Sequence, residues 1–144
     1  MRDALQAAIA HVAEDSFFAM AGVAEPGWRD AWADQADWLE SSVTFHGAGE
    51  GTLTCRLPRT LVRDLSAAFL GLTEDQVDDS IEFDMTGELA NMVCGCWLTR
   101  AFPADLFALE PPEAQLGSFA PGDDWLIVML NGAPLGVFVT GRGV

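Results

Sequence analysis

The amino-acid sequence predicts an α+β fold, in which two long helices pack on one face of an antiparallel sheet. Apolar residues recur at helical spacing over residues 3–21 and 75–101, whereas residues 41–57 and 115–140 show strand-like patterns interrupted by turns. Helices and strands do not alternate regularly, which disfavours a parallel sheet. The chain has 144 residues, half of them hydrophobic, which is enough for one core and too few for two. We therefore expect a single domain over residues 1–144.

The N-terminal segment predicts a helix over residues 3–21 that ends at Gly22, before a turn at residues 25–27. Its apolar face consists of Leu5, Ala8, Ile9, Val12, Ala13, Phe17 and Met20. The next segment holds Trp28, Trp32 and Trp38 among acidic residues. Two interpretations stay open. The segment is either a loop that packs its indoles on the core, with Trp28 and Trp32 together on a short helix, or a tryptophan-lined surface for a partner.

Residues 41–57 predict a β-hairpin with its turn at residues 46–51. Pro58 ends the hairpin and begins a helix that runs to about Leu70, where Gly71 closes it. The predicted inward residues of this helix are Leu61, Leu65, Ala68 and Phe69. Thr73 and Gln76 have the spacing of a capping box, which announces the next helix.

Residues 75–101 hold the longest helical pattern, which Pro103 ends. The predicted buried stripe comprises Ile81, Met85, Leu89, Met92 and Cys96, flanked by Val93 and Trp97. Three strand-like segments follow over residues 115–119, 125–130 and 135–140, with turns at residues 121–124 and 131–134. Their order predicts an antiparallel meander.

The charge of the chain excludes several classes of partner. Seven basic and 22 acidic residues leave a formal net charge of −15, which repels nucleic acid and anionic membranes and attracts a partner that presents lysines. No apolar run is long enough to span a bilayer, and charged residues interrupt the first 24 residues, unlike a signal peptide. Three cysteines without a secretory signal predict reduced thiols and a cytoplasmic location.

A polar constellation on the long helix is the candidate functional site. Asp84, Glu88 and Asn91 are spaced by four and three residues, so a helix places all three on one side. Small residues surround them, including Gly87 and Gly95, and each mid-helix glycine costs roughly 1 kcal/mol relative to alanine. Close approach by another surface is one compensation for that cost, and packing against a neighbouring helix is the other.

The order Asp or Ser, three residues, Glu, two residues, Asn is the signature of the CheC/CheX/FliY chemotaxis phosphatases. Here it reads Asp84, Glu88 and Asn91 within GELANMVCG, on a helix that follows a hairpin–helix unit, and the chain resembles CheX-like members of that family. CheC-type members carry the Glu-x-x-Asn pair twice. At the matching place in the first helix this chain has Glu14 and Phe17, so it resembles the single-site, CheX-like pattern.

The resemblance implies a phosphatase of two-component signalling that acts on the phosphoryl-aspartate of a CheY-like receiver domain. It implies that Glu88 and Asn91 are catalytic: Asn91 orients the hydrolytic water, and Glu88 anchors the active-site lysine of the receiver. Asp84, Gly87 and Gly95 are then partner-binding residues. The receiver supplies Mg²⁺, so the chain needs no metal or cofactor of its own. CheX relatives pair through sheet edges, which makes a homodimer through the strands over residues 126–139 a further expectation.

Alternative functions remain. Cys94 and Cys96 diverge by about 200° on a helix, and Cys55, His11 and His46 lack ligand spacing, so the sequence predicts neither a metal site nor a Cys–His hydrolase. We expect Cys96 in the core and Cys94 at the surface. The main rival is a non-catalytic, CheX-like adaptor that binds a receiver without hydrolysis. A structural subunit of a motor switch, as in FliY-like relatives, is a third interpretation.

Overall fold

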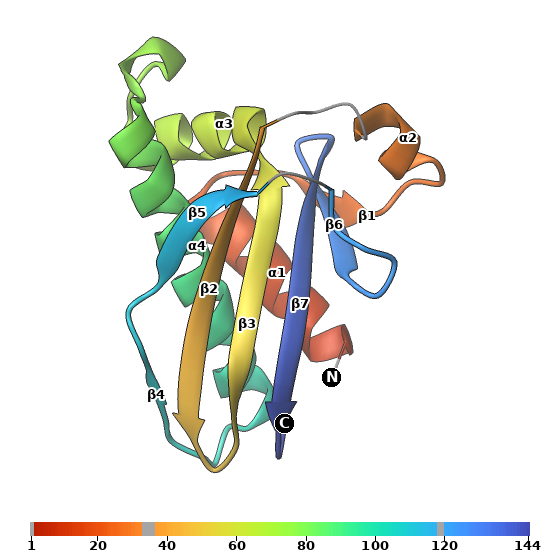
Figure 1. The fold of residues 1–144 in the computed structure, drawn as a ribbon, viewed down its shortest axis with the longest axis vertical. Helices are drawn as coiled ribbons and strands as arrows, with labels where there is room; N and C mark the ends of the chain where they lie inside the picture. The colour runs from red at the N-terminus through yellow and green to blue at the C-terminus, as the bar shows by residue number, and fades with distance from the viewer. Residues whose placement is uncertain (1, 33–36, 118–119) are drawn as a thin grey trace.

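The computed structural model describes residues 2–32, 37–117 and 120–144, and it confirms the predicted α+β fold (Figure 1). In this part of the chain, seven strands form one antiparallel sheet in the order β1-β6-β7-β3-β2-β4, and β5 also pairs with β2. The strands are β1 (Ala21–Val23), β2 (Trp38–Gly47), β3 (Glu50–Pro58), β4 (Phe107–Leu109), β5 (Glu113–Gly117), β6 (Leu126–Leu130) and β7 (Ala133–Arg142). The helices are α1 (Arg2–Ser16), α2 (Trp28–Trp32), α3 (Arg59–Leu70) and α4 (Asp79–Ala101), with a 3₁₀ turn at Glu74–Gln76.

The two long helices, α1 and α4, lie side by side on one face of the sheet, and α3 lies across its upper end (Figure 1). The strands alternate accordingly. In β2 the side chains of Leu39, Ser41, Val43 and Phe45 are fully buried on the helix side, while Glu40, Ser42 and Thr44 between them are more exposed. α4 packs on β2 and β3 and α1 on β1 and β6, and burial of the apolar residues between them forms the core and fixes α4 on the sheet.

The first helix ends at Ser16, earlier than predicted. Phe17 is buried, and Phe18 takes a left-handed backbone conformation (φ 54°), which turns the chain toward the edge strand β1. Gly22 lies inside β1 and is not the helix stop. Met20 is 80% exposed rather than inward, and its main-chain N–H donates to Asn131 Oδ1 at 2.8 Å. The helical spacing of apolar residues therefore continues in the sequence beyond Ser16, although the helix ends there and the chain turns at Phe18.

The tryptophan segment divides between a helix and a strand. Trp28 and Trp32 are the two ends of the short helix α2; Trp28 is half-buried, with the Arg29 guanidinium over its ring, and Trp32 packs against the core. Trp38 begins β2 and is fully buried. These positions agree with packing of the indoles, while residues 33–36 of the segment lie outside the described residues.

The hairpin and the helix after it have the predicted order. β2 and β3 pair in register from Trp38–Pro58 to Phe45–Gly51, and α3 starts directly after Pro58 and ends at Gly71 (φ 67°). The predicted capping box of Thr73 and Gln76 forms, but it caps the 3₁₀ turn Glu74–Gln76, and α4 starts at Asp79, later than the predicted residue 75. The inward face of α3 is different near its end: Ala68 and Phe69 are exposed, whereas Val62 and Ser66 are buried. The last turn of α3 lies at the margin of the core: Phe69 packs against Phe17 there, with 5.0 Å between the ring centroids, but stays 38% exposed.

The predicted C-terminal meander is only half right. β6 and β7 form a hairpin over Asn131 and Gly132, which both have positive φ as a two-residue turn requires. β5, however, pairs with β2 at the opposite side of the sheet, and β7 pairs with β3. Phe119, which we expected in this strand, lies outside the described residues. β1 pairs with residues 128–130 of β6, and β6 pairs with residues 133–137 of β7, so among the described residues the outer edges of residues 126–127 and 138–142 have no strand partner, and the homodimer stays a prediction.

Candidate functional site

Helix α4 carries the candidate site and is fixed at both ends. The Asp78 carboxylate accepts a hydrogen bond from the main-chain N–H of Ile81 (2.9 Å), which caps the first turn. At the other end, Phe102 leaves helical conformation directly before Pro103. The buried face of α4 contacts α1, α3 and strands of the sheet. The helix is thus a rigid support for whatever its outer side presents.

The sequence-predicted residues share the outer side of α4. At 100° per residue, Asp84, Glu88, Asn91 and Gly95 fall within about 60° of one another. Asp84 and Glu88 are exposed, and Asn91 and Gly95 are half-exposed. In the described part of the chain, no hydrogen bond or ion pair engages the side chains of Asp84, Glu88 and Asn91. Two carboxylates and a carboxamide are therefore left free to bind a partner, and we call these four residues the α4 stripe.

The two glycines of the candidate site have different surroundings. Gly87 is buried, and a Cβ added there would lie 3.2 Å from Pro112 Cγ, so this glycine allows the loop before β5 to pack on α4. A Cβ on Gly95 would meet nothing within 4 Å. Packing within the chain therefore accounts for Gly87 but not for Gly95, whose cost to the helix has no structural compensation in the described residues.

Sequence reasoning missed a buried charge on the same helix. Glu82 is fully buried and accepts hydrogen bonds from Arg59 Nε (2.5 Å) and Arg63 Nη2 (2.8 Å) of α3. These hydrogen bonds to Glu82 raise the pKa of both guanidinium groups. Arg59 also pairs with Asp79 in the first turn of α4. Two features of the sequence could have indicated this cluster. Glu82 lies three residues before Met85, on the apolar side of the predicted helix, and the preceding helix carries two arginines four residues apart, Arg59 and Arg63.

A groove runs beside the α4 stripe. It has a volume of about 450 Å³ and is lined by Phe83, Asp84, Gly87 and Glu88 of α4 and by Pro112 and Ala114 from the β5 side. It is open to solvent, and two of its α4 residues belong to the α4 stripe. Any molecule that contacts Glu88 therefore also meets this groove.

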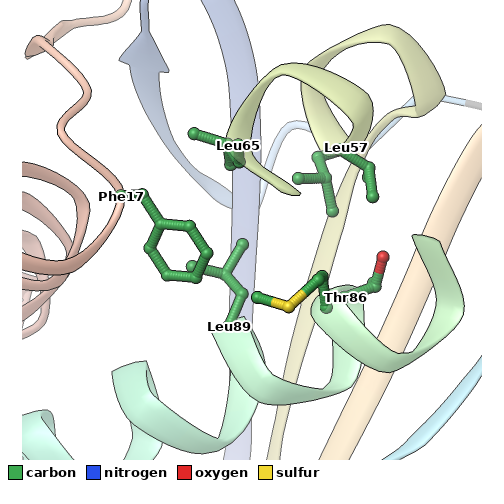
Figure 2. Close-up of a pocket in the computed structure, with 7 residues that line it drawn as sticks. Phe17, Leu57, Leu65, Thr86 and Leu89 are labelled. Atoms are coloured by element: carbon green, nitrogen blue, oxygen red, sulfur yellow. The ribbon is translucent and has the colours of Figure 1, made fainter. Parts of the chain in front are cut away.

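The closed pocket beneath α3 does not compete as a site. Figure 2 shows Phe17, Leu57, Leu65, Thr86 and Leu89 converging on it; Phe17 directly follows α1, and the others come from β3, α3 and α4. It leaves no room for a water molecule, and its one hydroxyl, on Thr86, donates to the main-chain oxygen of Glu82. It is a small packing defect between the helices, away from polar chemistry.

The cysteines are placed differently from our expectation. Cys94 is buried and Cys96 is half-exposed. The reason is that the buried face of α4 is rotated from the predicted stripe by about 100°, the angle between consecutive residues of a helix. Cys55, which lacks ligand spacing in the sequence, lies close enough to Cys94 in the fold for the two groups to interact electrostatically. Burial raises the pKa of both thiols, that of Cys94 to about 12, so both stay protonated at neutral pH. Among the described residues, no group of three His, Cys, Asp or Glu side chains is arranged to hold a metal ion.

Comparisons with known proteins identify a family whose sequence model covers α4, and solved structures that share the fold of this chain. The family model for the chemotaxis phosphatase CheX matches residues 40–119, more than half of the chain, including all of α4. CheX from Vibrio vulnificus superposes with a TM-score of 0.71 at 15% identity, over 97% of this chain and 95% of that one. CheX from Desulfovibrio desulfuricans gives 0.71 at 14% identity, over 97% of both chains.

A third structure, the CheX–CheY–BeF₃–Mg²⁺ complex from Borrelia burgdorferi, gives a TM-score of 0.62 at 16% identity, over 97% of this chain and 96% of that one. At these identities the superpositions show a common fold. No curated protein sequence matches the chain at a significant level. In the described residues, no helix has the length and apolar character needed to cross a lipid bilayer.

Proposed function

The chain belongs to the CheX family of chemotaxis phosphatases, and from this premise we propose that it hydrolyses the phosphoryl-aspartate of a CheY-like receiver domain. The observation that carries the proposal is the free α4 stripe, in which a carboxamide and a carboxylate lie on one exposed helix side and have no hydrogen-bond or ion-pair partner among the described residues. The family provides the reaction class, and the arrangement of Glu88 and Asn91 supports a division of roles.

Asn91 is proposed to orient the water that attacks the phosphorus. An acyl phosphate is already activated, so hydrolysis needs an in-line water and neutralised charge rather than a protein nucleophile. The amide oxygen of Asn91 can accept a hydrogen bond from that water while the amide nitrogen donates to another acceptor. The half-exposed position of Asn91 suits this role, because the water must be held where the phosphoryl group can reach it.

Glu88 is proposed to anchor the receiver through its active-site lysine. A carboxylate–ammonium hydrogen bond that becomes enclosed on docking fixes both distance and orientation. Asp84, one turn earlier and also exposed, adds attraction for the same basic surface. At Gly95 the helix surface is free of side chain, which suits close approach of a partner, whereas Gly87 can contribute only through the groove that it lines.

The solved complex of the Borrelia burgdorferi protein contains CheX, CheY, BeF₃ and Mg²⁺. It supports a CheY-like receiver as the partner of this chain. The receiver is proposed to bring the Mg²⁺, which would neutralise charge on the phosphoryl oxygens. The net charge of −15 favours association with a receiver that presents basic groups. Pairing of two copies of this chain stays a prediction, as does a cytoplasmic location.

The test is the decay of phosphorylated receiver at substoichiometric amounts of this protein, over a panel of receivers from the same organism. We expect Asn91→Ala to slow catalysed decay by about 100-fold while receiver affinity changes little. Glu88→Ala should weaken both decay and affinity. Glu14→Ala, an exposed glutamate on α1, is the matched control and should change neither.

Two outcomes of this assay would contradict the proposal. Unchanged decay with Asn91→Ala would remove the catalytic assignment. Protection of the phosphoryl group that rises with the amount of protein, with no turnover, would instead favour the non-catalytic adaptor.

A further inference from the structure

The edge of the sheet beside the α4 stripe carries an apolar surface that the proposed reaction does not use. We propose that the receiver domain also docks in the groove between α4 and β5, where Leu116 is its principal apolar contact. This inference rests on the proposed function and adds to it the surface that selects the receiver. Glu88 and Asn91 act on the phosphoryl pocket, while the β5 side would determine how firmly the receiver is held.

Leu116 is exposed on the side of the sheet where α4 lies. Its register partner Leu39 is fully buried on that side, and because paired residues project to the same face, Leu116 points there as well. Unlike Leu39, Leu116 remains 59% exposed. α4 contacts β5, and Ala114, two residues earlier on the same face of β5, lines the groove with Asp84 and Glu88. Leu116 therefore continues the β5 wall of the groove.

The backbone of β5 is also open on its outer edge. In the described residues, β5 pairs with β2 alone, so alternate main-chain N–H and C=O groups on its other edge have no strand partner. Figure 1 shows β5 at the border of the sheet, next to the upper half of α4. A partner that lies on the α4 stripe and extends to this border gains hydrogen-bond partners as well as apolar contact.

Charge and position favour a receiver over a second copy of this chain. The α4 wall presents Asp84 and Glu88, and neither carboxylate is paired with a basic residue of the described chain. A second copy would bring a net charge of −15 toward two further carboxylates. A receiver whose lysine is held by Glu88 has basic character at the point of contact, and its neighbouring surface then lies over the groove.

The experiment compares Leu116→Asp with Leu106→Asp. Both leucines are exposed, by 59% and 90%, so neither substitution should unfold the protein. They lie at opposite ends of β2, because Leu116 pairs with Leu39 whereas the main-chain oxygen of Leu106 lies beside Gly47. Affinity is measured with a receiver held in its activated form by beryllofluoride and Mg²⁺, and turnover with the same receiver phosphorylated by acetyl phosphate.

Leu116→Asp should raise both Kd and KM by about tenfold, the scale of losing one buried leucine, and leave kcat unchanged. Leu106→Asp should change none of the three. Unchanged Kd and KM for Leu116→Asp, in a protein whose turnover still depends on Asn91, would overturn the docking surface and leave the proposed function intact. If the protein shows no turnover but Leu116→Asp still weakens binding, the proposed function fails and the surface stands. Dimers of this protein that dissociate with Leu116→Asp would assign the groove to a second copy and overturn the proposal.

Discussion

Two glutamates on the same helix, six residues apart, have opposite surroundings. Glu82 is fully buried and held by Arg59 and Arg63, whereas Glu88 is exposed and engages no other side chain of the described residues. The rotation of the helix separates them: Glu82 faces α3, and Glu88 faces solvent with the rest of the α4 stripe. Residue type alone thus does not tell a carboxylate that is paired inside the fold from one that is left free at the surface.

The two surroundings determine whether the charge of each glutamate is neutralised inside the fold or stays available at the surface. The hydrogen bonds of Glu82 join α3 to the first half of α4, so its charge is neutralised inside the fold. Glu88 has no such compensation, and its full negative charge is available to an incoming cation. The buried glutamate holds the helix in place, and the exposed one is left to meet a partner.

The largest effect expected from this comparison is on stability. Glu82→Ala removes the main partner of two arginines that still reach solvent, and it should lower the free energy of unfolding by about 1–3 kcal/mol. Glu88→Ala should change it by less than about 0.5 kcal/mol, because its side chain touches little. Urea unfolding of both variants measures the difference. Similar losses for the two variants would mean that Glu88 also supports the fold, and the comparison would break.

The sequence was sufficient for the local elements of the fold but not for its long-range pairing. The β2–β3 hairpin and the stop of α3 at Gly71 depend on neighbouring residues, and both formed where predicted; the capping box of Thr73 and Gln76 also formed, but on a 3₁₀ turn before α4. The pairing of β5 with β2 depends on contacts between distant segments, which strand-like alternation does not encode. The three-residue strands β1 and β4 are too short to leave a periodic signal.

The sequence predicted the exposed side of α4 correctly, but it misplaced part of the buried face of the same helix. Spacing alone predicted that Asp84, Glu88 and Asn91 share one helix side, and they do. The buried face was misplaced because α4 packs against the sheet and two helices at once, so its covered surface is wide and includes polar and small residues. Glu82 and Cys94 lie on that surface: glutamate is a type that is rarely buried, and Cys94 fell outside the predicted apolar stripe.

A smaller effect should separate Gly87 from Gly95. Gly95→Ala adds a methyl group in open space and should raise the free energy of unfolding by about 0.5–1 kcal/mol through helix propensity. Gly87→Ala gains the same propensity but must shift Pro112, whose Cγ would be 3.2 Å away, so it should be the less stable variant. Thermal and urea unfolding rank the two. If Gly95 is where a partner approaches, its alanine variant should also bind the receiver more weakly despite its greater stability.

The smallest effect concerns a second pair of like residues on α4, and it tests the orientation of the helix without any partner. Cys94 is buried and Cys96 is half-exposed. Because the thiolate is the reactive form, raising the pKa of Cys94 from 9.0 to about 12 lowers its thiolate fraction at neutral pH by about 1,000-fold, and burial also excludes the reagent. Ellman's reagent should therefore modify one thiol of the native protein, and all three after unfolding.

Cys96→Ser should abolish the native reaction and Cys94→Ser should preserve it. The reverse result would mean that α4 is rotated, and then Glu82 and Glu88 would not have the opposite surroundings on which their different roles depend.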